Sequence, residues 1–66
     1  MLITINGESR EVREGITLAG LLGELEIQTR GTAVEINREI VPRASHEKRA
    51  IANGDVIEII RMVGGG

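Results

Sequence analysis

The sequence predicts a small two-layer α+β domain, in which a mixed β-sheet is crossed on one face by a single helix. Two observations carry this prediction. Stretches with two-residue periodicity occur near both ends and in the middle of the chain, and one stretch between them has leucines at helical spacing. The chain has 66 residues, a length at which only about 60% of the unfolded chain's surface becomes buried. We therefore expect one simple core.

The first expected element is a β-hairpin. Residues 2–5 are rich in strand-forming residues, and Asn6 with Gly7 favours a type I′ turn because both positions accept positive φ. Residues 8–13 are predicted to form the returning strand. Alternation places one set of apolar side chains on the inner face of this hairpin, namely Met1, Ile3, Ile5 and Val12.

The expected helix begins after Gly15. Thr17 occupies the N-cap position, where its hydroxyl can accept a hydrogen bond from an unpaired amide of the first turn. Gly20 and Gly23 each lower helix propensity by up to about 1 kcal/mol relative to alanine, so the helix depends on packing against the sheet. Its apolar stripe predicts a helix of about ten residues and consists of Leu18, Leu21, Leu22 and Leu25.

The second half of the chain supplies the remaining strands. Residues 27–32 are predicted to form a loop, and residues 33–37 alternate as a strand. A tight reversal at Asn37 leads into a short strand over residues 39–41, which ends at Pro42 because proline cannot donate to a continuing ladder.

A polar segment and a turn precede the last strand. One turn of helix is expected at residues 45–48, and residues 53–55 carry a strong turn signal, Asn-Gly-Asp. The last strand covers residues 56–63, with Ile57 and Ile59 on the face that meets the helix.

Charge and hydropathy exclude several classes of protein. The net charge is −2 with both signs interspersed, and the chain has no aromatic residue, so a nucleic-acid surface is not expected. Every apolar run is shorter than the roughly 20 residues that span a bilayer, and Met1 leads into a strand pattern without a basic leader. We expect a soluble cytoplasmic protein that is monomeric alone and binds neither nucleic acid nor membrane.

Residues for catalysis or metal binding are sparse. The chain has no cysteine, and His46 has no second ligand at metal spacing, which predicts an exposed loop histidine and no metal site. Thr17 and Ser45 have no neighbouring base that would make them nucleophiles, and both are predicted to be helix caps. Catalysis by this chain alone is therefore the least favoured function.

The chain ends in Gly64, Gly65 and Gly66, which we separate as a flexible tail over residues 64–66 from a folded domain over residues 1–63. Terminal glycines are often frayed and inert. Alternatively, the terminal carboxylate is the reactive group, and the glycines let it enter a channel too narrow for side chains. From Met62 onward five residues reach about 16–18 Å when extended, enough to place Gly66 inside another protein's active site.

Several features occur together along the whole chain: Ile3 to Asn6, Thr17-Leu18 with Leu21-Leu22, Ala33 to Asn37 continuing through Ile40-Val41-Pro42-Arg43, Asn53-Gly54-Asp55 leading into Ile57-Glu58-Ile59, and the terminal Gly65-Gly66. In this combination the chain resembles the ubiquitin-like β-grasp sulfur carriers of the ThiS/MoaD family. It is most similar to the thiamine branch, because the molybdopterin branch tends to be longer and to carry aromatic residues. The third glycine, Gly64, is one more than the family pattern requires.

The resemblance implies a carrier that is not an enzyme and binds no cofactor. A ThiF-type adenylating enzyme, which resembles a ubiquitin-activating E1, would use ATP to adenylate the carboxylate of Gly66, with Gly65 as its required neighbour. A sulfur donor protein would then supply sulfur to form a thiocarboxylate. A ThiG-type thiazole synthase would use that sulfur to build the thiazole ring of thiamine.

Apolar residues of the last strand also suggest a surface for these partners. Ile60 and Met62 alternate away from the helix, and Val41 of the short strand is expected to join them. Arg61, close to the tail, is a candidate for pairing with an acidic group of a partner enzyme. Three alternatives stay open: a molybdopterin-type carrier, a protein modifier that joins the glycine carboxylate to lysines, and an interaction module with an idle tail.

Overall fold

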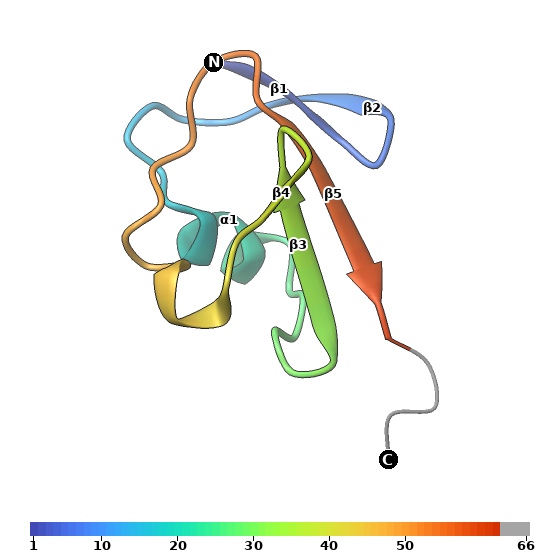
Figure 1. The fold of residues 1–66 in the computed structure, drawn as a ribbon. Coiled ribbons are helices and arrows are strands. Elements are labelled where there is room, and N and C mark those ends of the chain that lie inside the picture. Colours follow the sequence, from blue (N-terminus) through green and yellow to red (C-terminus); the bar gives the residue numbers. More distant parts are fainter. Residues whose placement is uncertain (63–66) are drawn as a thin grey trace.

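The computed structural model describes residues 1–62, which form one five-stranded mixed sheet and one α-helix packed on one of its faces (Figure 1). The predicted α+β class is confirmed. In chain order the elements are β1 Leu2–Ile5, β2 Glu8–Glu11, α1 Leu18–Glu24, β3 Thr32–Ile36, β4 Glu39–Ile40, the 3₁₀ turn η1 Arg43–Ser45 and β5 Val56–Arg61.

The strand order β2-β1-β5-β3-β4 places the last strand at the centre of the sheet (Figure 1). β5 runs parallel to β1 and antiparallel to β3. Parallel neighbours cannot be joined by a hairpin, so the chain crosses one face of the sheet, where α1 lies, before β5 is added. Met62, the last described residue, therefore follows the central strand of the sheet.

The N-terminal hairpin is confirmed, with positive φ at both turn residues, +49° at Asn6 and +84° at Gly7. Its second strand ends at Glu11 and not at residue 13 as expected, although Val12 still donates its N–H to the Met1 carbonyl at 2.8 Å. The turn also contacts the central strand, because Asn6 Oδ1 accepts a hydrogen bond from the Ile59 N–H at 2.8 Å.

Thr17 caps α1 as predicted, with its Oγ1 accepting the Gly20 N–H at 3.1 Å. The helix is shorter than expected and ends in a Schellman motif at Glu26, whose φ is +57°. There the Glu26 N–H donates to Gly23 O at 3.1 Å and the Ile27 N–H donates to Leu22 O at 2.9 Å. Glutamate is an unusual residue at this left-handed position, so no glycine or asparagine marks the end of the helix in the sequence.

The core is aliphatic and lies between α1 and the sheet. The inward faces of the strands are those predicted, since Ile57 is fully buried and Ile59 is partly buried against the core. The buried apolar residues are Ile3, Ile16, Leu18, Leu21, Leu22, Val34, Ile36, Val41, Ile51 and Ile57. Val41 was expected on the opposite face, and this prediction is wrong.

The segment between β4 and β5 differs most from expectation. The predicted turn of helix at residues 45–48 is a 3₁₀ turn at Arg43–Ser45, and it has no side-chain cap, so Ser45 is not a helix cap. His46 is buried, with 4% of its surface exposed, and the prediction of an exposed loop histidine is wrong. Its Nε2 lies 3.0 Å from the Val41 carbonyl oxygen, which can only accept, so Nε2 carries the proton.

This segment is ordered because it supplies hydrogen-bond acceptors to α1. The Leu18 N–H donates to Arg49 O at 2.8 Å, and the Ala19 N–H donates to His46 O at 2.9 Å. First-turn amides have no partner within their own helix, so these carbonyls satisfy groups that water would otherwise have to solvate. A polar sequence is thereby held in one conformation.

Candidate functional site

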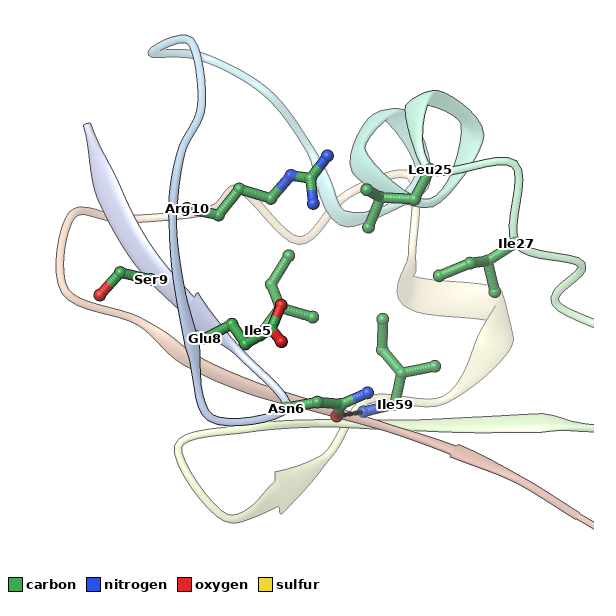
Figure 2. Close-up of a pocket in the computed structure, with 8 residues that line it drawn as sticks. All are labelled: Ile5, Asn6, Glu8, Ser9, Arg10, Leu25, Ile27 and Ile59. Atoms are coloured by element: carbon green, nitrogen blue, oxygen red, sulfur yellow. Dashed lines mark hydrogen bonds between the residues drawn. The ribbon is translucent and has the colours of Figure 1, made fainter.

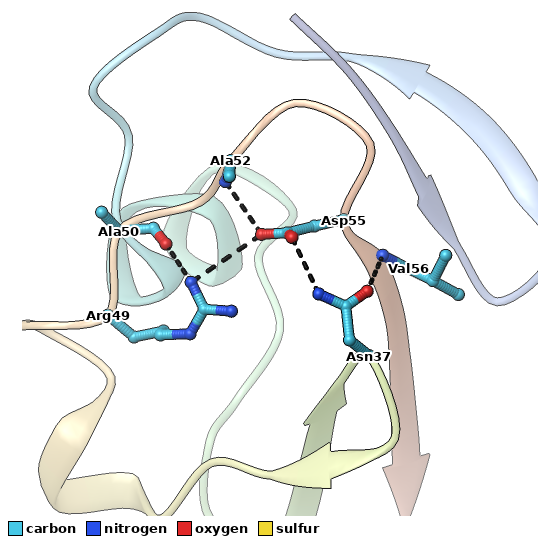
Figure 3. A network of polar contacts seen from close by, with 6 residues as sticks. All are labelled: Asn37, Arg49, Ala50, Ala52, Asp55 and Val56. Carbon is cyan, nitrogen blue, oxygen red and sulfur yellow. Dashed lines mark hydrogen bonds and ion pairs between the residues drawn. The ribbon is translucent and has the colours of Figure 1, made fainter.

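The start of β5 is held by a buried carboxylate, Asp55, of which 6% is exposed (Figure 3). Its Oδ2 accepts the Ala52 N–H at 2.8 Å, and its Oδ1 accepts from Asn37 Nδ2 at 3.0 Å. Asn37 Oδ1 in turn accepts the Val56 N–H at 3.0 Å. The turn after β3 and the turn before β5 are thus joined through side chains.

Arg49 completes this network. Its Nη1 lies 3.8 Å from Asp55 Oδ2 and also donates to the Ala50 carbonyl (Figure 3). Both oxygens of Asp55 are therefore occupied by groups of the protein itself. This arrangement is structural: it fixes where β5 begins. The sequence indicated a turn at residues 53–55, but nothing in it pointed to Asn37 and Arg49 as partners of the carboxylate.

The end of β5 is held by the loop that precedes β3. The Met62 N–H donates to the Gly31 carbonyl at 2.8 Å, which ties the last described residue to the loop before β3. Gly64, Gly65 and Gly66, the predicted reactive tail, lie outside the described residues, as does Val63 at the predicted end of the strand. The point at which the chain departs for Gly66 is nevertheless fixed.

The sheet face opposite α1 carries exposed apolar side chains along and beside β5. Ile60 is 46% exposed and Met62 is 60% exposed, so the predicted exposure of both is confirmed. The exposed large apolar residues of residues 1–62 are Leu2, Ile40, Val56, Ile60 and Met62.

β4 contributes Ile40 to this face and not Val41. Ile40 pairs with Glu35 and is 68% exposed, whereas Val41 is 9% exposed within the core. Adjacent residues of a strand point to opposite faces, so an error of one residue in register exchanges the exposed residue for the buried one. Val41 is therefore not part of the partner surface.

Arg61 follows Ile60 in β5, so its side chain points to the opposite face of the sheet. It pairs with Thr32 across β3 and β5 and lines a hollow of about 530 Å³ beside Met62. Arg30 and Glu26 line the same hollow, which we call the tail-root hollow. Of the predicted site residues, Ile60 and Met62 are exposed, and Arg61 and Met62 line the tail-root hollow.

A separate groove of about 390 Å³ lies on the helix side of the sheet, between the β1–β2 hairpin and the end of α1 (Figure 2). Ile5, Leu25, Ile27 and Ile59 supply apolar walls, and Figure 2 shows their side chains directed toward one another. The polar residues that line it are Asn6, Glu8, Ser9 and Arg10. The groove offers apolar contact and contains no histidine, cysteine or lysine.

Residues 1–62 contain no group of three or more His, Cys, Asp or Glu side chains placed to hold a metal ion. Within the same range, α1 has seven residues, and no helix has the length and apolarity needed to cross a membrane.

The ThiS family model matches residues 3–66. The chain is 46% identical to a thiazole synthase from Paramagnetospirillum magneticum over 66 residues, all of this chain but 20% of that protein. It is 34% identical to the sulfur carrier protein ThiS of Thermus thermophilus, with 98% of this chain and 100% of the relative covered. It thus spans about a fifth of the synthase and the whole of the carrier.

The fold agrees with these relatives. The crystal structure of a thiamine biosynthesis protein (ThiS) from Geobacter metallireducens superposes with a TM-score of 0.89 at 30% identity, and all of both chains is covered. The ubiquitin-like β-grasp fold implied by the resemblance is therefore confirmed. With a family model that matches nearly the whole chain and a carrier relative that it covers end to end, this chain belongs to the ThiS family.

Proposed function

We propose that this chain is a sulfur carrier for thiamine biosynthesis and acts as a protein substrate, not as an enzyme. The carboxylate of Gly66 attacks the α-phosphate of ATP on an activating enzyme, and pyrophosphate leaves. Sulfide supplied through the sulfur donor protein then attacks the acyl carbon of Gly66. The bond to phosphate breaks and AMP leaves, so a thiocarboxylate remains on Gly66. The α-carboxyl group of a peptide ordinarily has a pKa of about 3.3–3.7, so such a group is anionic and nucleophilic at neutral pH.

The observation that carries the proposal is the family match, which extends over residues 3–66 and so includes the terminal glycines. The central position of β5 supports it. The strand is held at its start by Asn37 and at its end by Gly31, so a folded body presents the tail from a fixed point.

The similarity to the thiazole synthase of P. magneticum supports one of the proposed partners, a thiazole synthase. A fifth of that protein is similar to this whole chain, so a carrier-like segment and a thiazole synthase occur there in one polypeptide. We infer that a ThiG-type thiazole synthase receives the sulfur from this carrier. A ThiF-type adenylating enzyme and a sulfur donor protein are the other proposed partners. Because the activating enzyme uses ATP, we place the carrier in the cytoplasm, monomeric between encounters and without a bound cofactor.

We propose which surface of the carrier these partners contact from the length of its C-terminal tail. Five residues from Met62 to Gly66 extend about 16–18 Å, so an enzyme that holds Gly66 in its active site must approach the body near Met62. Ile40 and Ile60 are exposed apolar residues on the sheet face opposite α1. Exposed apolar residues on one face are suited to a protein interface.

The test is an intact mass measurement after incubation with ATP, a sulfur donor and the activating enzyme, followed by fragmentation. We expect a gain equal to the exchange of one oxygen for sulfur, located at Gly66. The matched control is the chain without Gly66, which should keep its circular dichroism spectrum, because the described core lies within residues 3–57, and should show no gain.

Three outcomes would contradict the proposal. Thiocarboxylate formation on the chain without Gly66 would place the reactive group elsewhere. An unchanged mass of the intact chain, with the same enzyme shown to be active on another carrier, would favour an interaction module. Transfer of the glycine carboxylate to lysines of other proteins would instead identify a protein modifier.

A further inference from the structure

The tail-root hollow carries two arginines, Arg30 and Arg61, that the proposed function leaves without an assigned partner. We propose that Arg30 and Arg61 form an electrostatic contact with the activating enzyme. Carboxylates of the enzyme, at the mouth of the channel that takes the tail, bind both guanidinium groups. This inference rests on the proposed function, since it concerns the surface beside which Gly66 is delivered.

The backbone holds both arginines close to the exit of the tail. Arg61 is the last residue of β5 and pairs with Thr32. Arg30 lies in the loop before Thr32, and this loop is closed by Thr32 Oγ1 donating to Gln28 O at 2.7 Å and by Thr32 N donating to Thr29 O at 3.2 Å. The Met62 N–H bond to Gly31 O joins this loop to the end of β5. Both arginines thus line one hollow, and these hydrogen bonds hold the backbone that carries them.

The charges of the hollow favour an acidic partner. The two ion pairs of residues 1–62 are Arg13–Glu24 and Arg49–Asp55, so neither arginine of the hollow has an ion-pair partner in the described part of the chain. Glu26 also lines the hollow and offsets one of the two positive charges. A net positive charge remains, in a protein whose formal net charge is −2. Guanidinium groups bind carboxylates in a bidentate geometry, which fixes orientation as well as adding attraction.

Chain length makes this surface part of the contact. When Gly66 reacts, at most about 16–18 Å of extended chain separates it from Met62. The mouth of a channel that encloses the tail must therefore lie against the surface that borders Met62. The tail-root hollow is part of that surface, because Met62 itself is one of its lining residues.

The activating enzyme is the partner with the greater need for such a contact. There the anionic carboxylate of Gly66 must approach the polyanionic triphosphate of ATP, and like charges repel. Binding energy from parts of the substrate remote from the reacting atoms can offset this cost. The thiazole synthase receives the tail after ATP has been used, so the same repulsion does not apply.

The experiment measures carrier-dependent ATP–pyrophosphate exchange by the activating enzyme for Arg30→Gln, Arg61→Gln and the double variant. We expect kcat/KM of the double variant to fall about tenfold or more through a higher KM, with kcat unchanged, because exposed charge pairs act mainly on encounter and orientation. Raising the salt concentration should lower kcat/KM of the unmodified carrier. The same increase in salt should lower kcat/KM of the double variant much less. Arg30→Lys with Arg61→Lys should keep most of the salt dependence.

Arg43→Gln with Lys48→Gln is the matched control for the double variant, since it also removes two positive charges. Both residues are exposed in the segment between β4 and β5, and neither lines the tail-root hollow or forms an ion pair within residues 1–62. We expect the kinetic constants of this control to equal those of the unmodified carrier.

Three outcomes would overturn the inference. One is a double variant whose kcat/KM and salt dependence match those of the Arg43→Gln, Lys48→Gln control. Another is a loss confined to kcat, because it would assign the arginines to the chemical step. If the unmodified carrier supports no exchange with an activating enzyme that is active on another carrier, the proposed function fails, and this inference fails with it. Circular dichroism of each variant checks that the fold is retained.

Discussion

Replacing Asp55 by asparagine should strongly destabilise the fold, although the two side chains have nearly the same shape. Both oxygens of Asp55 accept hydrogen bonds, one from Asn37 Nδ2 at 3.0 Å and one from the Ala52 N–H at 2.8 Å. An amide has only one oxygen, so its NH₂ group must face one of these two donors. A hydrogen bond to a charged group contributes about 1.5–3 kcal/mol. We expect the free energy of unfolding to fall by about 2–3 kcal/mol.

The assay is urea unfolding followed by far-ultraviolet circular dichroism, since a chain without aromatic residues offers no intrinsic fluorescence. For a domain of this size the predicted loss corresponds to a decrease in Tm of about 8–24 °C. The matched control is Glu39→Gln, which makes the same change in charge at an exposed residue of β4 and should change stability by less than about 0.5 kcal/mol. If Asp55→Asn is as stable as this control, Asp55 does not accept the two hydrogen bonds described, and β5 is anchored by other contacts.

Three further predictions concern separate parts of the chain. His46→Ala should lower the free energy of unfolding by about 2–4 kcal/mol, because it leaves a buried space and removes the donor to the Val41 carbonyl. His46→Gln keeps a donor and should lower it less. Urea unfolding compares the two variants. Gly23→Ala should raise the free energy of unfolding by up to about 1 kcal/mol in the same assay, since a Cβ there meets no atom within 4 Å; a loss of stability would contradict this. Ile60→Glu should weaken binding to the activating enzyme about tenfold by calorimetry, with stability changed by less than about 1 kcal/mol; unfolding would show that Ile60 belongs to the core.

Local signals were sufficient to predict most of the elements. The Asn6-Gly7 turn and the Thr17 cap each depend on groups within a few residues of one another, and both were found as predicted. The alternation of β5 also predicted correctly that Ile57 faces the helix and Ile60 does not. In each case the physical cause is contained in a short stretch of sequence.

The errors arose where the cause is distant in sequence. His46 is buried because the segment that carries it supplies carbonyl acceptors to α1, a contact between residues 27 positions apart for the Ala19 N–H and His46 O. No periodicity in the polar segment reports this contact. Val41 was misplaced for a related reason, because β4 has only two residues and alternation over so short a strand does not define its register.

The distribution of roles along the chain explains why a domain this small can serve as a carrier. The described core lies within residues 3–57, and the network around Asp55 anchors β5 at its start, so stability is concentrated away from the tail. The exposed residues Ile60, Arg61 and Met62 follow the last core residue of the strand. Substitutions there are therefore expected to change recognition by partners without large changes in folding. The proposed function requires this separation, because the terminal carboxylate must be free to react in one enzyme and then in another while the body that presents it keeps one structure.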